Sequence, residues 1–113
     1  MSRQLPDEYL SALFDRLEEA SHKYALAKAK RFGLGEQRKI TKNQLMLVAE
    51  AAGHKSHAKQ EIHTYTNPIY IALVADLVKS IEDETNLEYE CKLIEMEWNS
   101  QRTHAANLRA ARV

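Results

Sequence analysis

The sequence feature that most constrains the fold is a long stretch without helix-breaking residues. After Pro68, neither glycine nor a further proline occurs up to the end of the sequence. Glycine and proline are the residues that most often end a helix, so the stretch predicts one helix over 68–112, ~67 Å long at ~1.5 Å per residue. A compact protein of 113 residues has a radius of gyration of only ~13 Å. Either the helix breaks, at the polar segment 82–86, or the first helix and other subunits cover it.

Composition supports an all-α fold. The sequence has only three glycines and two prolines, and apolar residues make up 44% of it. Alanine and leucine are much more frequent than β-branched residues, which disfavours a β fold. The one cysteine, Cys91, excludes an internal disulfide framework and fits a reducing compartment. Apolar runs are far shorter than ~18 residues, so the sequence predicts a cytoplasmic protein without membrane span or signal peptide.

The spacing of apolar residues predicts a first helix over 7–32. Apolar side chains recur there at steps of three and four residues, which places them on one helix face. They are Leu10, Leu13, Phe14, Leu17, Ala20, Tyr24 and Ala27. Gly33 and Gly35 are predicted to end this helix.

Residues 33–67 are predicted to form a loop and short helices. One short helix begins at Thr41, whose hydroxyl can cap it, and ends at Gly53. The next runs from Ser56 to about Thr66. Asn67 and Pro68 then suit the cap and the first position of the last helix.

The last helix carries apolar residues on two faces. One stripe contains Tyr70, Val74, Leu77 and Ile81. Further along, Leu87, Cys91, Ile94 and Trp98 lie within ~60° of one another, and Tyr89, Leu93 and Met96 lie on nearly the opposite face. A helix that is apolar on two sides is buried on two sides. These seven residues, 87–98, are therefore the predicted oligomer interface; the alternative is a monomer that folds back on itself.

Together these features predict an all-α protein with a single helical domain over 1–113. Its expected architecture is an antiparallel helical hairpin with short connecting helices and a long C-terminal helix. The protein is expected to be a homo-oligomer with coiled-coil packing.

Charge is segregated along the chain although the net charge is zero. Residues 23–75 contain nine basic and three acidic residues, whereas residues 76–97 contain two basic and eight acidic residues. Such blocks predict either contact between opposite blocks of two molecules or an anion-binding zone. The alternative is that the charges intermix again once the helices pack together.

No arrangement of residues indicates catalysis or a metal site. His54, His57 and His63 are close in sequence, but on a helix His57 and His63 would lie ~240° apart, without the spacing of a zinc site. Cys91 and His104 are separated by ~20 Å along one helix, too far to form a nucleophile–base pair. We therefore expect no enzyme activity, no metal and no cofactor.

The remaining chemistry is anion recognition. Lysine and arginine neutralise phosphates, and aromatic side chains stack on unpaired bases. Tyr24, Phe32 and Tyr65 are interleaved with the basic residues. The predicted nucleic-acid-binding residues are Lys23, Lys28, Lys30, Arg31, Arg38, Lys39, Lys42, Lys55 and Lys59.

The stretch LMLVAEAAGHKSHAKQEIHTYTNPIYIALV and the closing EWNSQRTHAANLRAAR resemble small helical phage proteins of the UvsY-like recombination-mediator group. The likeness covers roughly residues 23–112. The matching positions are Gly53, Lys55, Ser56, Ala58, Glu61, Pro68, Tyr70, Trp98, Ser100, Ala106, Asn107 and Arg109.

This resemblance implies an oligomer that binds single-stranded DNA in the phage-infected bacterial cell. Such a protein helps to load a recombinase onto strands coated by a single-strand-binding protein, and it has no catalytic residues. The alternative hypothesis is a non-catalytic protein–protein interaction module that inhibits a host or defence complex.

Overall fold

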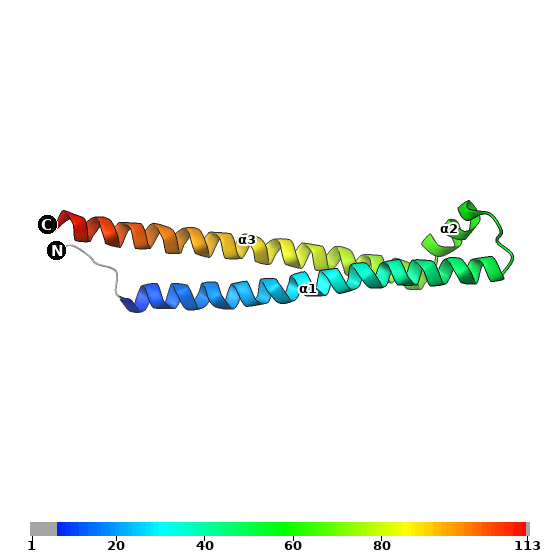
Figure 1. The fold of residues 1–113 in the computed structure, drawn as a ribbon, viewed down its shortest axis with the longest axis horizontal. Helices are drawn as coiled ribbons and strands as arrows, with labels where there is room; N and C mark the ends of the chain where they lie inside the picture. The colour runs from blue at the N-terminus through cyan, green and yellow to red at the C-terminus, as the bar shows by residue number, and fades with distance from the viewer. Residues whose placement is uncertain (1–6, 113) are drawn as a thin grey trace. The chain divides into compact units, whose positions relative to one another are not determined.

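The computed structural model describes residues 7–112, and the predicted all-α fold class is confirmed for them. Three helices follow one another: α1 (Asp7–Ala51), α2 (His57–Tyr65) and α3 (Pro68–Ala111) (Figure 1). Residues 1–6 and 113 of the predicted domain lie outside the described part. Among these three helices, none has a segment apolar and long enough to cross a membrane.

The contacts between the helices divide the chain into two compact units. The central unit is Ala27–Glu84, and the terminal unit contains residues 7–26 and 85–112 of the described chain. α1 and α3 each contribute to both units, whereas α2 belongs to the central unit alone. The single domain over 1–113 stays a prediction.

Within each unit, α1 and α3 pack antiparallel. In the terminal unit the rings of Phe14 and Trp98 are 5.9 Å apart between centroids, whereas Lys23, further along α1, lines a cavity with Glu90, further back along α3. Tyr9 also donates a hydrogen bond to Glu97. In the central unit Arg31 contacts Glu84, and Arg38 contacts Tyr70. Arg38 lies further along α1 than Arg31, whereas Tyr70 lies before Glu84 on α3, so the two helices run in opposite directions. Each unit therefore contains a section of an antiparallel helix pair.

The predicted end of the first helix at Gly33 was wrong. α1 continues through Gly33 and Gly35, and Thr41 lies inside it instead of capping a new helix. A glycine in a helix interior costs only about 1 kcal/mol relative to alanine. Contacts of α1 with α3 lie on both sides of the two glycines, at Arg31 and Arg38, and they offset this cost.

The other predicted helix ends are confirmed. Gly53 adopts a left-handed φ of 101° just after α1 ends. The Ser56 side chain caps α2 by accepting a hydrogen bond from the backbone N–H of Lys59 at 3.2 Å. The Asn67 side chain likewise accepts one from the N–H of Ile69 at 2.9 Å, at the start of α3. Each of these ends depends on local chemistry that the sequence displays.

α3 does not break at the polar segment 82–86. Two of its three acidic residues form ion pairs: Lys79 pairs with Asp83 at 3.1 Å one turn away, and Arg31 of α1 pairs with Glu84. The segment is therefore compatible with a helix because most of its negative charge is compensated.

Most covered positions of α1 and α3 recur at alternating steps of three and four residues, as in a coiled coil. On α1 they are Leu10, Leu13, Leu17, Ala20, Tyr24, Ala27, Arg31, Leu34, Arg38, Thr41 and Leu45. On α3 they are Tyr70, Leu73, Leu77, Ser80, Glu84, Leu87, Cys91, Ile94, Trp98, Gln101, Ala105 and Leu108. We call these two sets the inward positions.

Some residues of the predicted apolar stripes lie outside this pattern. Phe14 is 51% exposed and Ile81 is 44% exposed, whereas Leu73 and Ser80 are buried. The prediction grouped neighbouring apolar residues, but the inward positions follow a period of about 3.5 residues and include polar residues. Ser80 and Glu84 therefore face α1 in this part of α3, where the apolar pattern predicted that Ile81 would.

Polar side chains occupy several inward positions of the central unit. Arg31 and Glu84 form an ion pair across the two helices, and the Glu84 side chain is only 12% exposed. Arg38 donates a hydrogen bond to the Tyr70 hydroxyl at 3.2 Å, and Tyr70 itself is buried. These polar contacts restrict which residues of α1 and α3 can face one another.

We predict that Gly33→Ala and Gly35→Ala each raise the free energy of unfolding by about 0.5–1 kcal/mol. Both glycines are helical, and an added Cβ at either would meet no atom within 4 Å. Gly53→Ala should instead lower it by about 1 kcal/mol, because its positive φ disfavours a side chain. Urea denaturation followed by circular dichroism measures all three. Loss of stability in both Gly33→Ala and Gly35→Ala would contradict a continuous α1.

We also predict that Arg31→Ala destabilises the protein by about 1–3 kcal/mol, because it leaves the covered Glu84 carboxylate without its cation. The double variant Arg31→Leu with Glu84→Leu should recover this loss or exceed it. Lys92→Ala, which removes an exposed pair with Glu88, is the control and should change stability by under about 0.5 kcal/mol. An equal loss in the single and double variants would show that the ion pair is not the cause.

Candidate anion-binding site

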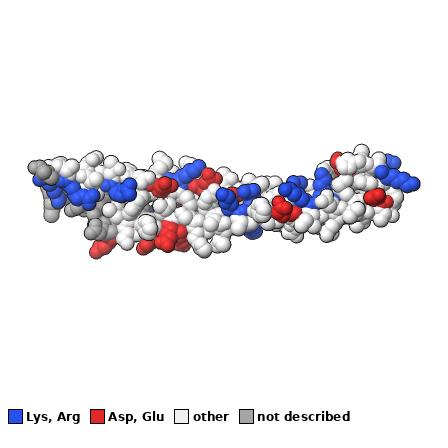
Figure 2. Space-filling model, in the orientation of Figure 1, with Lys and Arg blue, Asp and Glu red and all other residues white. Residues whose placement is uncertain are grey.

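Packing of the helices mixes the charge blocks of the sequence. By residue count, the central unit contains nine basic and seven acidic residues, and the described part of the terminal unit contains six basic and nine acidic residues. On the face that Figure 2 shows, basic and acidic side chains are interspersed. A candidate anion site must therefore be sought among the few cations that carboxylates do not neutralise.

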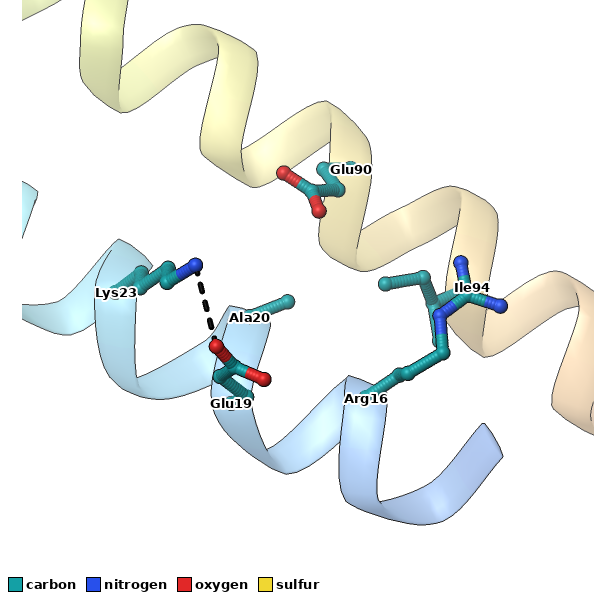
Figure 3. A pocket seen from close by; sticks show the side chains of 6 residues that line it. All are labelled: Arg16, Glu19, Ala20, Lys23, Glu90 and Ile94. Carbon is teal, nitrogen blue, oxygen red and sulfur yellow. Dashed lines mark ion pairs between the residues drawn. The ribbon is translucent and has the colours of Figure 1, made fainter. Parts of the chain in front are cut away.

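Lys23 belongs to a balanced group of charges in the terminal unit. It pairs with Glu19 at 3.3 Å. Both residues line a small cavity of about 110 Å³ together with Arg16 of α1 and Glu90 of α3 (Figure 3). Two cations and two carboxylates around one cavity give no net attraction for an anion.

Three more of the predicted residues also lie next to carboxylates. Arg31 is engaged by Glu84. Lys30 lines a cavity together with Asp76 and Asp83. Lys39 is near Glu36, at 3.4 Å on an exposed face, where such a pair is worth little.

The remaining predicted residues differ in their surroundings. Lys28 and Lys55 are exposed. Lys59 lines a pocket with His54 and His63, whose rings are 5.3 Å apart between centroids. Arg38, Lys39 and Lys42 are the ones that the structure brings together.

Arg38, Lys39 and Lys42 line one pocket of about 480 Å³ in the central unit. The other lining residues are Asn43 and Met46 of α1 and His57 of α2. None of these six residues is acidic. We call this pocket the cationic pocket.

Tyrosines, instead of carboxylates, hold two of these cations in place. The Arg38 guanidinium donates to the Tyr70 hydroxyl, and the Lys42 ammonium lies 5.3 Å from the centre of the Tyr65 ring. The rings of Tyr65 and Tyr70 are themselves 5.5 Å apart between centroids. Because tyrosine is neutral, it orients a cation without cancelling its charge.

The pKa of Lys42 is raised above its ordinary value. The hydrogen bond and electrostatic interaction with Tyr65 are the main causes, and Glu61 contributes less. Glu61 is in turn paired with His57 at 2.6 Å. Lys42 is therefore a full positive charge at neutral pH, with one carboxylate nearby but outside the pocket lining.

The aromatic residues predicted to alternate with the cations have different positions. Tyr24 is an inward residue of the terminal unit, and Phe32 is 65% exposed outside the cationic pocket. Tyr65 contacts Lys42 and Tyr70, so it orients a cation as well as offering an exposed edge. Sequence reasoning missed this role of Tyr65 and Tyr70, which no local pattern reveals.

The predicted oligomer interface is divided between two faces of α3. Ile94 is buried, Leu87 and Cys91 are half-buried, and Trp98 contacts Phe14 of the same chain. The other three residues are exposed: Tyr89 by 64%, Leu93 by 48% and Met96 by 66%. We call Tyr89, Leu93 and Met96 the outer stripe.

Within residues 7–112, no group of three or more histidine, cysteine, aspartate and glutamate side chains could hold a metal ion. The cationic pocket instead has the chemistry to bind a phosphate or another oxyanion.

Comparison with known protein families, curated proteins and solved structures finds no match for this chain. The resemblance to the UvsY-like recombination-mediator group stays a prediction.

We predict that Tyr65→Phe lowers the pKa of Lys42 towards the ordinary value of lysine, because the hydroxyl is its main hydrogen-bond partner. The contribution of this contact to stability is present below the unfolded pKa and is lost as the pH rises through the raised folded pKa. A pH titration of the Lys42 side chain by NMR measures the shift. Lys79, whose pKa is raised by Asp83, is the internal control and should not change.

Proposed function

We propose that this protein is a non-catalytic accessory protein that binds single-stranded nucleic acid through the cationic pocket. One observation carries the proposal: Arg38, Lys39 and Lys42 line a pocket without acidic lining residues, and two of them are oriented by tyrosines. Oriented cations lose little side-chain freedom when they bind a phosphate. The pocket therefore suits the phosphate groups of a nucleic-acid backbone.

A single strand fits this site better than a duplex. About three cations in one pocket can neutralise a few adjacent phosphates but not the dense charge of double-stranded DNA. The Tyr65 ring is 44% exposed beside them, where its edge can contact a base. Because the net charge is zero, we expect modest affinity that falls steeply with salt.

The resemblance to the UvsY-like group extends this proposal to a cellular role. In that role the protein is a phage recombination mediator in the cytoplasm of the infected bacterial cell. It assists recombinase loading, and its partners are single-stranded DNA, a recombinase or a single-strand-binding protein, and further copies of itself.

Self-association is the second part of the proposal. The outer stripe presents three large apolar side chains on one face of α3, and contiguous apolar patches of this kind mark interaction sites. Coverage by other copies would bury the second apolar face of the helix.

A protein–protein interaction module, such as an inhibitor of a host or defence complex, is the other candidate function. The observation that favours it is the amount of apolar surface: sixteen of the large hydrophobic residues that the structure describes are exposed. This candidate needs no cationic pocket, so the two functions predict different responses to nucleic acid.

Titration of a labelled single-stranded oligonucleotide at several salt concentrations tests the proposed function. Each lost phosphate contact reduces the slope of log affinity against log salt by ~0.7. We expect the double variant Lys39→Gln with Lys42→Gln to weaken binding to any sequence and to flatten this slope by about 1.4.

The matched control is Lys79→Gln, which removes an exposed lysine of the same unit that lines another cavity. It should leave both affinity and slope nearly unchanged. If the unmutated protein binds no oligonucleotide at low salt, the nucleic-acid proposal is wrong and the interaction module replaces it.

A further inference from the structure

A second concave surface of the central unit is lined by apolar residues and by more cations than carboxylates. This groove, of about 280 Å³, runs between α1 and α3. Its apolar lining residues include Phe32, Leu77 and Ile81. Its charged lining residues are three cations, Arg31, Arg38 and Lys39, and one carboxylate, Glu36, which pairs with Lys39. Gly35 also lines it, and no atom lies within 4 Å of where its side chain would begin. The groove is therefore open enough to admit a side chain from outside.

The outer stripe of the terminal unit has the opposite character. Tyr89, Leu93 and Met96 are spaced by four and three residues, which places them on one face of α3. Glu90 and Glu97 lie seven residues apart, at ~80–100° from Tyr89, so both flank the same side of the stripe. The stripe is thus an apolar ridge with an acidic border on one side and Lys92 on the other.

We propose that the groove of one copy binds the outer stripe of a second copy, so that the molecules associate head to tail. This inference rests on the self-association proposed above and names the surface that receives the stripe. The apolar side chains of the stripe enter the groove, and Glu90 and Glu97 approach Arg38 and Lys39 of the other copy. Two contributions to the binding free energy are then favourable: apolar area is buried, and opposite charges meet.

On the flank that carries Glu90 and Glu97, charge disfavours pairing of the stripe with itself. In an antiparallel pair of α3 helices centred on Leu93, the same flank of each helix meets its counterpart. Glu90 of one copy would then lie beside Glu97 of the other, and like charges at an interface are unfavourable. The groove instead offers this flank Arg38 and Lys39, with Glu36 as its one acidic lining residue.

A head-to-tail contact uses a different surface on each of the two molecules. Every copy in a pair then keeps one unused groove or one unused stripe. Assembly therefore continues beyond a dimer, either to a closed ring or to an open chain.

A mixing experiment with full-length variants tests this inference. Phe32→Glu places a carboxylate in the groove, where it repels the acidic border of the stripe. Leu93→Glu places one in the stripe, where it would be buried in the apolar groove. By light scattering behind a sizing column at micromolar concentration, we expect a mass above twice 13.0 kDa for the unmutated protein. Each variant alone should give 13.0 kDa.

A 1:1 mixture of the two variants should give twice 13.0 kDa. Phe32→Glu retains an intact stripe and Leu93→Glu retains an intact groove, so one good contact forms and assembly stops there. Leu47→Glu is the matched control, because Leu47 is on α1 in the same unit and is 65% exposed, as is Phe32. It should assemble like the unmutated protein.

Circular dichroism checks that each variant keeps its helices. If one of the Glu variants loses them, Phe32→Ser or Leu93→Ser replaces it with the same expected masses. The inference is overturned if Phe32→Glu alone still assembles, or if Leu93→Glu alone does. A mixture that stays at 13.0 kDa also overturns it.

An unmutated protein that is monomeric overturns the self-association of the proposed function as well. Titration of the single variant Lys42→Gln with the oligonucleotide is separate from this outcome, because Lys42 lines the cationic pocket but not the groove, whereas Lys39 lines both.

Discussion

The structure depends on one constraint: within each unit, each long helix has only one other long helix to pack against. α1 and α3 face each other along their inward positions, which follow the spacing of a coiled coil. A helix pair covers one face of each partner and leaves the other face outside. Many large apolar residues therefore remain exposed although the chain is helical almost throughout the described part, and both the outer stripe and the groove arise in this way.

The polar inward positions of the central unit determine which cations remain available for a ligand. Arg31 is used by Glu84, so its charge is cancelled inside the helix pair. Arg38 lies two inward positions further along α1, where its partner is the hydroxyl of Tyr70. The same kind of residue is thus neutralised at one position and left charged at the other. The difference depends on whether α3 presents a carboxylate or a tyrosine at that level.

Sequence reasoning succeeded where structure depends on local chemistry and failed where it depends on distant partners. Gly53, Ser56 and Asn67 act within a few residues of themselves, and their roles were predicted. The continuity of α1 through Gly33 depends on contacts with α3, so glycine propensity alone misplaced the helix end. The candidate site was predicted in part: its cations were among the nine named. Their selection required pairings between residues far apart in sequence, Arg38 with Tyr70 and Lys42 with Tyr65, which no spacing rule reveals.

The cationic pocket and the groove share Arg38 and Lys39. Nucleic-acid binding and head-to-tail assembly, as proposed, therefore draw on the same two positive charges. A phosphate on Lys39 weakens its attraction for Glu90 and Glu97 of another copy, and a docked stripe weakens the attraction for phosphate by the same free energy, since such coupling is reciprocal. Lys42 and His57 line only the pocket, and Phe32 and Leu77 line only the groove, so each surface also has contacts of its own. Such an arrangement links the size of the assembly to the occupancy of its nucleic-acid site without a change in the fold.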